Sequence, residues 1–584
     1  MARFAFPTLL ILIFVGYFSI QVCPTFYYWD SAELTAAVIA DGVPHPPGFP
    51  LLLILGKIFL ALVPFNKGLA LNLLSALFGV IGLALWYFVI RTVLELYSDK
   101  LHRIASDLIS FLATIVLGTS FAFSIQAVRF EVYSLSFAFF ALIFLMALLV
   151  YKSEKGATGR VLILAAAVGL ALGTHILTII LALPGIVLLL YMSRRVKVSQ
   201  FLLAASISFL LAFISYGYIY LLARHQPVLN WGDPSDLRRF FDYMTAREFT
   251  TSISSFNLGH VVANVVFAIN LMIRQFGLPA ILLSIWGLYG LVRHKGRIGY
   301  PLLLILVLNV FSIIFSESFY YDNYDQLGYL VISLAVMALS GAAGLWLLYG
   351  LLKGLIKGSE TRLFGNPAVY VTVVVAALIY AYPLRTNTFA ADLSDVHGAD
   401  QYAADFLSGA PDGAVMITSY YNTYFCLLAE QVVSGRSANH TVVNLYNWDH
   451  GWGKEATARL FGKDLDVNAD RQTFYRNFLN GLMKDVPIYV EYDESSAPLA
   501  KYLLPDGLGY ILTSPDTSVI STASVTAEIE DRQAALAGKR DAETIRTWVY
   551  WFQNRGLFLQ QRGYPDLAEV CFAAVESLSV SQRR

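Results

Sequence analysis

The sequence predicts a polytopic α-helical membrane protein with a soluble α/β domain at its C-terminal end. Of its 584 residues, 57% are hydrophobic and only 14% are charged, whereas soluble domains carry about 25% charged residues. Apolar runs long enough to cross ~30 Å of hydrocarbon recur as far as residue 384 and then stop. The residues that follow have the composition of a soluble protein.

The charges divide at the same point in the chain. Residues 1–384 hold 24 Lys and Arg against 16 Asp and Glu, and residues 385–584 hold 17 against 25. The net charge of zero therefore conceals a basic membrane part and an acidic tail. Cys23, Cys426 and Cys571 lie far apart in the sequence, which predicts neither a disulfide framework nor a zinc site.

About eleven apolar segments are predicted to span the membrane. The first resembles a signal peptide, but no small-residue cleavage site follows it, so we interpret it as a retained span. Segment 47–63 is short, begins with Pro-Gly-Phe-Pro and contains Lys57, which favours an amphipathic helix at the interface. The predicted spans are residues 5–22, 68–92, 105–124, 130–151, 161–178, 179–193, 200–222, 276–293, 299–316, 328–350 and 368–384.

Cations gather in alternate connections between these spans, and this pattern predicts the orientation. The positive-inside rule places the N-terminus and these connections in the cytoplasm. The first outer loop (23–67), the long outer loop (223–275) and the tail then lie on the extracytoplasmic face, and we expect a bacterial or archaeal cell membrane rather than the endoplasmic reticulum. The cations of the five inner connections are Arg91, Lys100, Arg103, Lys152, Lys155, Arg160, Arg194, Arg195, Lys197, Arg293, Lys295, Arg297, Lys353, Lys357 and Arg362.

The first outer loop carries the polar motif "YYWDSAELTAAVIADGVPHPPGF" (27–49). Asp30 and Glu33 are three residues apart at the start of an Ala-rich helix, so both side chains lie on one face. One interpretation is a capping box, in which Asp30 caps the helix and Glu33 bonds back to the cap. A cap does not explain the His-Pro-Pro that follows, and carboxylates at the edge of hydrocarbon indicate a functional site by default.

An acidic helix after the first span, then His-Pro-Pro-Gly and an apolar interface helix, resembles the GT-C glycosyltransferases. The form "DSAEL…GVPHPPGFPL" is most similar to the protein O-mannosyltransferase-related family. Four further blocks resemble that family in the same order along the chain. They are "LNLLSALFG" (71–79), "QAVRFEVYSL" (126–135), "GLALGTHILT" (169–178) and "LNWGDP" (229–234).

The resemblance implies a GT-C fold and the transfer of a sugar from a polyprenyl- or dolichyl-phosphate donor. The acceptor would be a protein, glycan or lipid on the extracytoplasmic face, and transfer would invert the anomeric carbon. Asp30 matches the catalytic position, where a carboxylate accepts the proton of the attacking hydroxyl. Glu33 and Glu131 are the other candidate catalytic carboxylates, with helix support as the alternative for Glu33 and a helix N-terminus for Glu131. Gly48-Phe49 stands where the eukaryotic motif has Gly-Lys, so mannose is only one candidate sugar.

Further residues are candidates for binding the donor or the acceptor. Asp233 is one of these candidates, and the alternative is that Asp233-Pro234 simply begins a helix. The long outer loop also holds five arginines (224, 238, 239, 247 and 274) and no lysine, and guanidinium forks suit phosphate. The "SESFYYDNYDQ" stretch (316–326) is predicted to complete the outer surface. The candidate binding residues are His45, Arg129, Tyr133, His175, Asn230, Trp231, Asp233, Arg238 and Arg247.

No metal motif or cofactor site is predicted. Asp322 and Asp325 could join Asp30 around a divalent cation, as in oligosaccharyltransferase-like members of the superfamily. The protein-mannosyltransferase branch, which the motifs resemble, needs no metal. The predicted partners are the lipid-linked donor, the acceptor and the membrane, with no nucleic acid.

The chain is predicted to divide into a catalytic membrane domain (1–384), an α/β domain (385–530) and a helical tail (531–584). "GAVMITS" (413–419) and "VPIYVEY" (486–492) have the pattern of strands. Residues 547–580 resemble one tetratricopeptide-type hairpin, which needs a neighbour to pack on and could dock an acceptor or partner. "NHT" (439–441) is a glycosylation sequon.

Two other classes of function are alternatives. A transporter or lipid flippase generally has ionisable groups or broken helices near the bilayer midplane. Here the charges lie at span ends and the polar clusters face one side, which favours chemistry at the surface on a lipid-borne substrate. A membrane-anchored binding scaffold would leave the acidic loop without a purpose.

Overall fold

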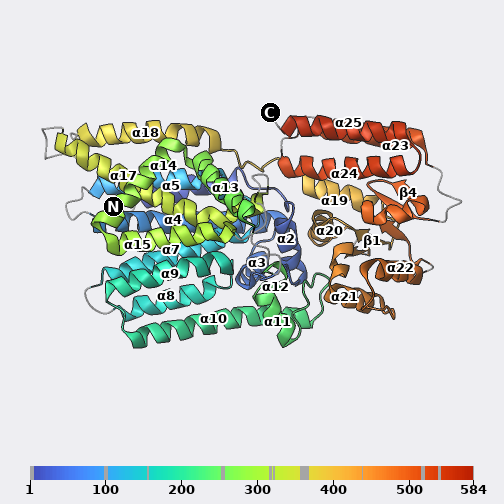
Figure 1. Ribbon diagram of the computed structural model, residues 1–584, viewed down its shortest axis with the longest axis horizontal. Helices are drawn as coiled ribbons and strands as arrows, with labels where there is room; N and C mark the ends of the chain where they lie inside the picture. Colours follow the sequence, from blue (N-terminus) through green and yellow to red (C-terminus); the bar gives the residue numbers. More distant parts are fainter. Residues whose placement is uncertain are drawn as a thin grey trace.

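The computed structural model describes a helical bundle joined to a smaller body that contains a sheet (Figure 1). It describes residues 5–97, 103–153, 157–250, 257–314, 319, 323–355, 367–436, 439–483, 485–513, 520–536, 539 and 541–582. Most bundle helices run side by side along the long axis of the molecule. They are α1 (Ala5–Ser19), α4 (Lys67–Tyr97), α5 (Arg103–Gly118), α7 (Val132–Tyr151), α8 (Thr158–Ala171), α9 (Ile176–Ser193), α10 (Val198–Arg224), α13 (Leu258–Phe276), α14 (Leu278–His294), α15 (Gly296–Ile314), α17 (Val331–Leu355) and α18 (Pro367–Asn387).

Among the described residues, eight helices are long and apolar enough to cross a membrane, or nine if the bent pair α5–α6 counts as one span. Helices α1, α8 and α14, which match three further predicted spans, are shorter apolar helices. The protein is therefore an integral membrane protein, as predicted. One difference is α13, which forms in a segment that the sequence assigned to the long outer loop. His260, Asn264 and Asn270 interrupt its apolar run and hide it from a search for continuous hydrophobicity.

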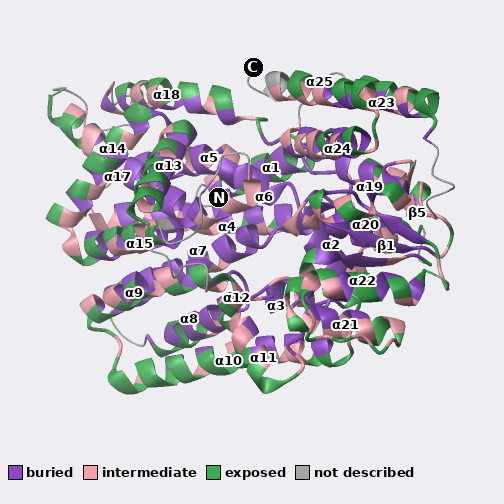
Figure 2. Ribbon diagram, turned by 45° about the vertical axis from the view of Figure 1, so that its right-hand side comes forward, coloured by how far each residue is buried: buried purple, intermediate pink, exposed green. Residues whose placement is uncertain are grey.

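The centre of the bundle is formed by α17 and α7, whereas α10 is largely exposed along its length (Figure 2). Small residues allow close approach between α14 and α17. A Cβ atom added at Gly287 would lie 1.9 Å from the carbonyl oxygen of Ser340. Lipid tails are as apolar as leucine, so packing through small residues, rather than exclusion of water, holds such helices together.

Short elements cover the end of the bundle that faces the tail. Thr119 and Ser120 donate hydroxyl hydrogen bonds to the carbonyls of Ile115 and Leu117, and the chain bends by 71° between α5 and α6. This bend brings α6 across the outer end of the bundle. The covering elements are α2 (Asp30–Ala40), α3 (Pro50–Leu62), α6 (Phe121–Ala127), α11 (Leu237–Met244), α12 (Arg247–Thr250), α16 (Tyr324–Leu327) and η2 (Gly328–Leu330).

The tail contains a five-stranded sheet in the order β2-β1-β3-β5-β4. Strand β1 is parallel to both neighbours, with Ile417 opposite Val443 and Val490, and β4–β5 form an antiparallel hairpin. Both strand-like runs predicted from the sequence are strands, β1 and β3. The strands are β1 (Val415–Thr418), β2 (Thr441–Asn444), β3 (Ile488–Val490), β4 (Leu503–Asp506) and β5 (Gly509–Leu512).

Helices surround this sheet and form the chain's last hairpin. Trp551 and Arg555 of α24 donate to the carbonyls of Leu508 and Gly507, which fixes the hairpin to the β4–β5 turn. The predicted helical pair is present, and its kinship with tetratricopeptide repeats stays a prediction. The helices are α19 (Gly398–Ser408), α20 (Tyr421–Ser434), η4 (Leu445–Asp449), α21 (Gly451–Phe461), α22 (Arg471–Leu482), η5 (Glu494–Tyr502), α23 (Thr522–Leu536), α24 (Ala542–Gln561) and α25 (Pro565–Gln582).

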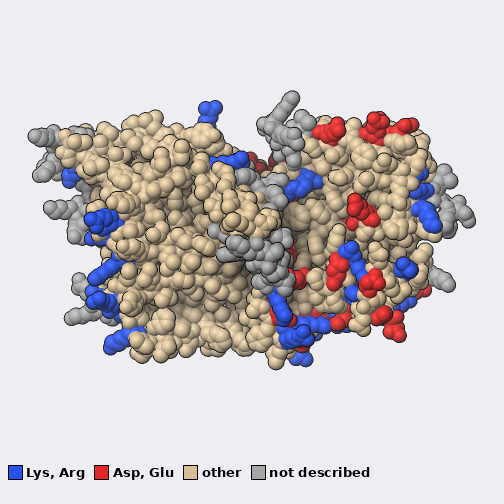
Figure 3. All heavy atoms as spheres, viewed as in Figure 1, with Lys and Arg blue, Asp and Glu red and all other residues tan. Residues whose placement is uncertain are grey.

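The charged surface has the asymmetry expected of a membrane protein. Figure 3 shows lysines and arginines at the bundle end farthest from the tail, a broad neutral belt, and mixed charges over the tail. The neutral belt is the surface that hydrocarbon would cover, and the cationic end fits the cytoplasmic side under the positive-inside rule.

We predict that the tail and the cationic end lie on opposite sides of the membrane. Asn439 and Lys197 are exposed, while all three native cysteines are buried and give little background. In sealed cells, a membrane-impermeant maleimide should label Asn439→Cys, and should label Lys197→Cys only after permeabilisation. The reverse pattern would overturn the orientation.

Candidate active site

Asp30 is the first residue of α2, at the junction of the bundle and the tail. The preceding residue, Trp29, has φ 55° and ψ −129°, a backbone conformation that side-chain-bearing residues rarely adopt. The Asp30 side chain is 30% exposed, so it is accessible while lying largely within the protein. This is the most accessible of the three predicted catalytic carboxylates.

Glu33 is fully buried and holds the His-Pro-Pro loop. Its Oε1 accepts from the backbone N–H of His45 at 2.7 Å, and its Oε2 lies 2.5 Å from Nδ1 of the same residue. The capping-box interpretation of Asp30 and Glu33 is therefore wrong, because the glutamate binds a residue twelve positions ahead rather than the start of its own helix. His45 Nε2 lies 3.9 Å from Asp30, so the histidine stands between both carboxylates.

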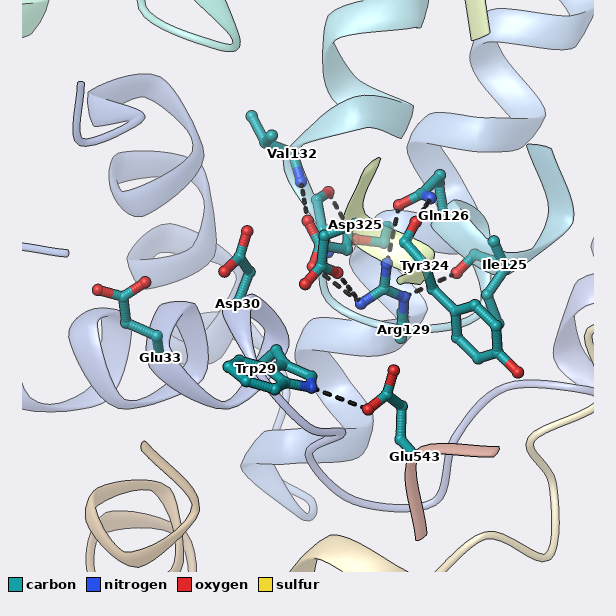
Figure 4. Close-up of polar contacts among 12 residues, drawn as sticks. Trp29, Asp30, Glu33, Ile125, Gln126, Arg129, Val132, Tyr324, Asp325 and Glu543 are labelled. Atoms are coloured by element: carbon teal, nitrogen blue, oxygen red, sulfur yellow. Dashed lines mark hydrogen bonds and ion pairs between the residues drawn. The ribbon is translucent and has the colours of Figure 1, made fainter. Parts of the chain in front are cut away.

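A second carboxylate group surrounds Arg129, which is only 1% exposed. Its Nη1 contacts Glu131 at 3.1 Å and Asp325 at 2.5 Å, and its other nitrogens donate to Gln126 and Ile125. Glu131 is the N-cap of α7, so the alternative interpretation, in which this carboxylate lies at a helix N-terminus, also holds. Figure 4 shows Asp30 between Glu33 and this Arg129 group.

The two groups share Asp30, and each could hold a metal ion. Oxygen and nitrogen atoms of Asp30, Glu33 and His45 lie within 4.8 Å of one another, as do oxygens of Asp30, Glu131 and Asp325. His45 and Arg129 already bring positive charge to the two groups. Asp322, which the sequence offered as a further ligand, lies outside the described residues.

Burial and charge shift the acid–base behaviour of this site. Burial raises the pKa of Asp30 to about 7, with a further increase from Asp325, while the charge of His45 opposes the shift. Burial alone would lower the pKa of His45, but the charges of Glu33 and Asp30 outweigh it and raise the value to about 10. Burial also raises the pKa of Glu131 well above its ordinary value. Asp30 is thus poised to exchange a proton near neutral pH.

Aromatic rings connect the His-Pro-Pro loop to the spans. The ring of His175 stacks on Phe49 with centroids 6.1 Å apart and lies 4.9 Å from Tyr133. Tyr329, which the sequence did not single out, completes the group at 4.8 Å from His175. The sequence predicted that His175 would lie at the outer end of the preceding span. Instead, helix α8 ends at Ala171 and His175 is the N-cap of α9. Burial lowers the pKa of His175 to about 3, so this ring is neutral.

The 229–234 segment joins the first outer loop to the tail. Val43 donates its backbone N–H to the carbonyl of Leu229 and accepts from the backbone N–H of Trp231. This bridge pairs the segment with the residues just before His45. The indole of Trp231 lies 6.3 Å from His45 on one side and stacks on Tyr421 of the tail at 5.1 Å. Trp231 thus stands between His45 and Tyr421 of the tail.

Asp233 has a structural role. It is buried and accepts from Gln226, Asn230 and Arg239. It lies at φ 41° in a turn, and it does not begin a helix, because α11 starts only at Leu237. Asn230 serves the same turn.

The five loop arginines have varied surroundings. Arg239 bridges Asp233 and Glu455 of the tail, Arg247 is exposed and paired with Asp242, and Arg224 lies over Tyr220. Arg238 is exposed on α11, and Arg274 is exposed on α13. Their role in holding a donor phosphate stays a prediction.

A cavity of about 140 Å³ lies between the 226–231 segment and the tail. Its walls combine the aromatic rings of Trp231, Tyr424 and Trp452 with neutral amides and one cation, Arg459. Such walls suit a neutral, hydroxyl-bearing or amide-bearing ligand.

Comparison with solved structures defines the class of fold. The structure is similar to that of ArnT from Cupriavidus metallidurans bound to undecaprenyl phosphate (TM-score 0.56, 13% identity, 88% of this chain and 98% of that chain). It is also similar to the apo oligosaccharyltransferase of Archaeoglobus fulgidus (TM-score 0.52, 13% identity, 89% of this chain and 75% of that chain). The fold is therefore the GT-C fold, as predicted.

Sequence comparison points to a particular branch. Residues 30–199 match the family model described as the protein O-mannosyl-transferase TMEM260 N-terminal domain. The mouse protein O-mannosyl-transferase TMEM260 is 28% identical over 411 residues, covering 66% of this chain and 55% of the mouse protein. The Dictyostelium discoideum protein of that name is 22% identical over 446 residues, covering 70% of this chain and 53% of its own length. The chain thus spans about half the length of these curated relatives.

These comparisons confirm the predicted resemblance to the protein O-mannosyltransferase-related family. The matched residues include Asp30, Glu33, His45, Arg129 and Glu131. Asn230, Trp231 and Asp233 lie beyond that match.

The Glu33–His45 pair predicts a pH-dependent stability. The pKa of His45 is raised from 6.5 to about 10, so its contribution to stability is fully present below pH 6.5 and is lost as the pH rises through about 10. Thermal unfolding in detergent should therefore occur at lower temperature as the pH rises across this window.

Glu33→Gln should reduce the free energy of unfolding at pH 6.5 by about 2 kcal/mol, because a charge-assisted hydrogen bond is lost. The unfolding temperature of this variant should also depend less on pH than that of the wild type. An unchanged slope in this variant would show that another group titrates.

Proposed function

We propose that this protein transfers a sugar from a polyprenyl-phosphate-linked donor to an acceptor hydroxyl at the extracytoplasmic membrane surface. The observation that carries the proposal is Asp30, a partly exposed carboxylate with a raised pKa at the outer end of a GT-C fold. The names of the mouse and Dictyostelium relatives favour mannose as the sugar and a protein as the acceptor. The ArnT structure, with its bound undecaprenyl phosphate, favours a lipid phosphate as the leaving group.

Asp30 acts in this proposal as the general base. The acceptor oxygen attacks C1 of the sugar while its proton passes to the Asp30 carboxylate, and the bond from C1 to the phosphate oxygen breaks. Lipid phosphate leaves with the electron pair of that bond. A single displacement of this kind inverts the configuration at C1, and a positioned base contributes typically 10²–10⁴-fold to such a step.

The surrounding residues support the same step. Glu33 fixes His45, whose positive charge stands beside Asp30. Arg129 pairs with both Glu131 and Asp325, and we assign Glu131 to a wall of the site and not to proton transfer. The arginines of the long outer loop stay our prediction for the donor phosphate, because bidentate forks suit phosphate oxygens.

We assign acceptor binding to the cavity beside Trp231. Its walls come from the long outer loop and the tail, and Trp231 stands between it and His45. A bacterial or archaeal cell membrane as the location stays a prediction, since the named relatives come from mouse and Dictyostelium.

Asp30→Asn is the decisive test of the base. The variant keeps the size of the side chain and removes the charge that accepts the proton. Transfer of tritiated mannose from polyprenyl phosphate to protein in native membranes should fall roughly 10²–10⁴-fold while donor binding persists.

Asp41→Asn is the matched control, because Asp41 ends the same helix and pairs with Lys57 away from the site. It should transfer at nearly the normal rate. A normal rate of mannose transfer by Asp30→Asn would show that Asp30 is not the base and has only a structural role.

The raised pKa of Asp30 predicts the pH profile. A general base must be unprotonated, so kcat/KM for the donor should be level above the pKa of about 7. Below it, kcat/KM should fall about ten-fold for each pH unit. A flat profile between about pH 5 and about pH 8 would exclude a base with the pKa that burial gives Asp30.

A further inference from the structure

The three residues immediately before Asp30 are all bound by the tail. Tyr27 donates its hydroxyl hydrogen bond to Asp541 at 2.6 Å, and the hydroxyl of Tyr28 lies 3.3 Å from Thr544 Oγ1. The indole N–H of Trp29 donates to Oε2 of Glu543 at 2.8 Å (Figure 4). The first turn of α24 therefore receives three successive side chains of the first outer loop.

The backbone at Trp29 also depends on the tail. A residue in such a sparsely populated conformation costs of order 1–3 kcal/mol and persists only where its surroundings impose it. Here the backbone N–H of Trp29 donates to Asn422 of α20 at 3.0 Å, and the indole packs edge-on against Tyr420 with centroids 5.2 Å apart. Two helices of the tail thus impose the conformation from which α2 starts.

Helix α2 has no local substitute for these contacts. Its N-cap is Trp29, which makes no side-chain capping hydrogen bond, whereas Ser, Thr, Asp or Asn would supply one. The distance of 3.9 Å from His45 to Asp30 is too long for a hydrogen bond to aim the carboxylate. The direction of Asp30 therefore follows from the start of α2.

The partners in the tail are themselves fixed. Glu543 is 2% exposed, and its second oxygen accepts from Arg546 at 2.9 Å. Asn422 donates to Thr547 at 2.9 Å, one turn further along α24. Because Arg546 holds one oxygen of the buried Glu543 carboxylate, the other oxygen has a fixed position for the indole N–H of Trp29. A rigid supporting shell of this kind is what keeps a catalytic group within a fraction of an ångström of its working geometry.

We propose that Glu543 and Asn422 are positioning residues for the transfer reaction, and that they aim Asp30 through Trp29. This inference rests on the proposed role of Asp30 as the base. It makes the tail part of the catalytic apparatus, in addition to any role in docking an acceptor. Trp29 is joined to Glu543 by one indole hydrogen bond and to Asn422 by one backbone hydrogen bond, so each bond can be removed separately.

Two substitutions remove the indole hydrogen bond from opposite sides. Trp29→Phe keeps an aromatic ring and loses the N–H, and Glu543→Ala loses the acceptor. Each should lower the maximal rate of mannose transfer about ten-fold in native membranes, with the apparent donor KM changed less than about two-fold. The double variant should be no slower than either single one, because both remove the same interaction.

Glu543→Gln provides the rescue, because its amide oxygen can still accept from the indole. It should keep most of the transfer rate. Glu528→Gln is the control for the tail, because Glu528 pairs with Arg555 at 2.8 Å and is not among the tail residues that bond Tyr27, Tyr28 or Trp29. It should transfer at the normal rate even if the protein unfolds at a lower temperature.

The outcomes separate this inference from the proposed function. Normal rates in Trp29→Phe and Glu543→Ala, together with an inactive Asp30→Asn, would reduce these contacts to domain packing and overturn the inference alone. Losses that multiply in the double variant would also overturn it. A fully active Asp30→Asn would instead overturn the proposed function. If Glu543→Ala does not fold, the comparison of Trp29→Phe with wild type decides the question.

Discussion

The site depends on the balance of buried charge around Arg129. Three segments of the chain meet at its guanidinium: Ile125 and Gln126 at the end of α6, Glu131 at the start of α7, and Asp325 in α16. Uncompensated carboxylates at this depth would be protonated or expelled, because desolvating a charge costs several kcal/mol. One arginine allows two acidic groups to stay beside Asp30, and the bend between α5 and α6 brings it there.

Local surroundings also make two carboxylates three residues apart differ in burial and in contacts. The sequence places Asp30 and Glu33 on one helical face and cannot distinguish them. In the folded chain Glu33 is enclosed and committed to His45, while Asp30 remains partly open between two cationic groups. Environment, and not residue type, separates the residue that holds the loop from the residue that can react.

Much of this architecture could be predicted from local patterns. Continuous apolar runs predicted most bundle helices, and short β-branched runs predicted β1 and β3. The motifs around Asp30, His45, Arg129 and Glu131 predicted candidate residues that the structure brings together, and each motif is carried by residues close in sequence. Helix α13 was missed since its polar residues break the run, and Tyr329 was missed since nothing local marks it. The contacts of Trp29 with Asn422 and Glu543 span about 400 to 500 positions, a distance at which a single sequence carries no pairing signal.

The separation of Trp29 from Glu543 along the chain also sets an order of events during synthesis. The first outer loop emerges from the ribosome and reaches the membrane surface long before α24 exists, because the two lie 514 residues apart. Until then the loop has its carboxylates but lacks the partners that impose the backbone at Trp29. A chain that has inserted its membrane helices therefore still lacks these contacts, and the folding of α20 and α24 supplies them at the start of α2.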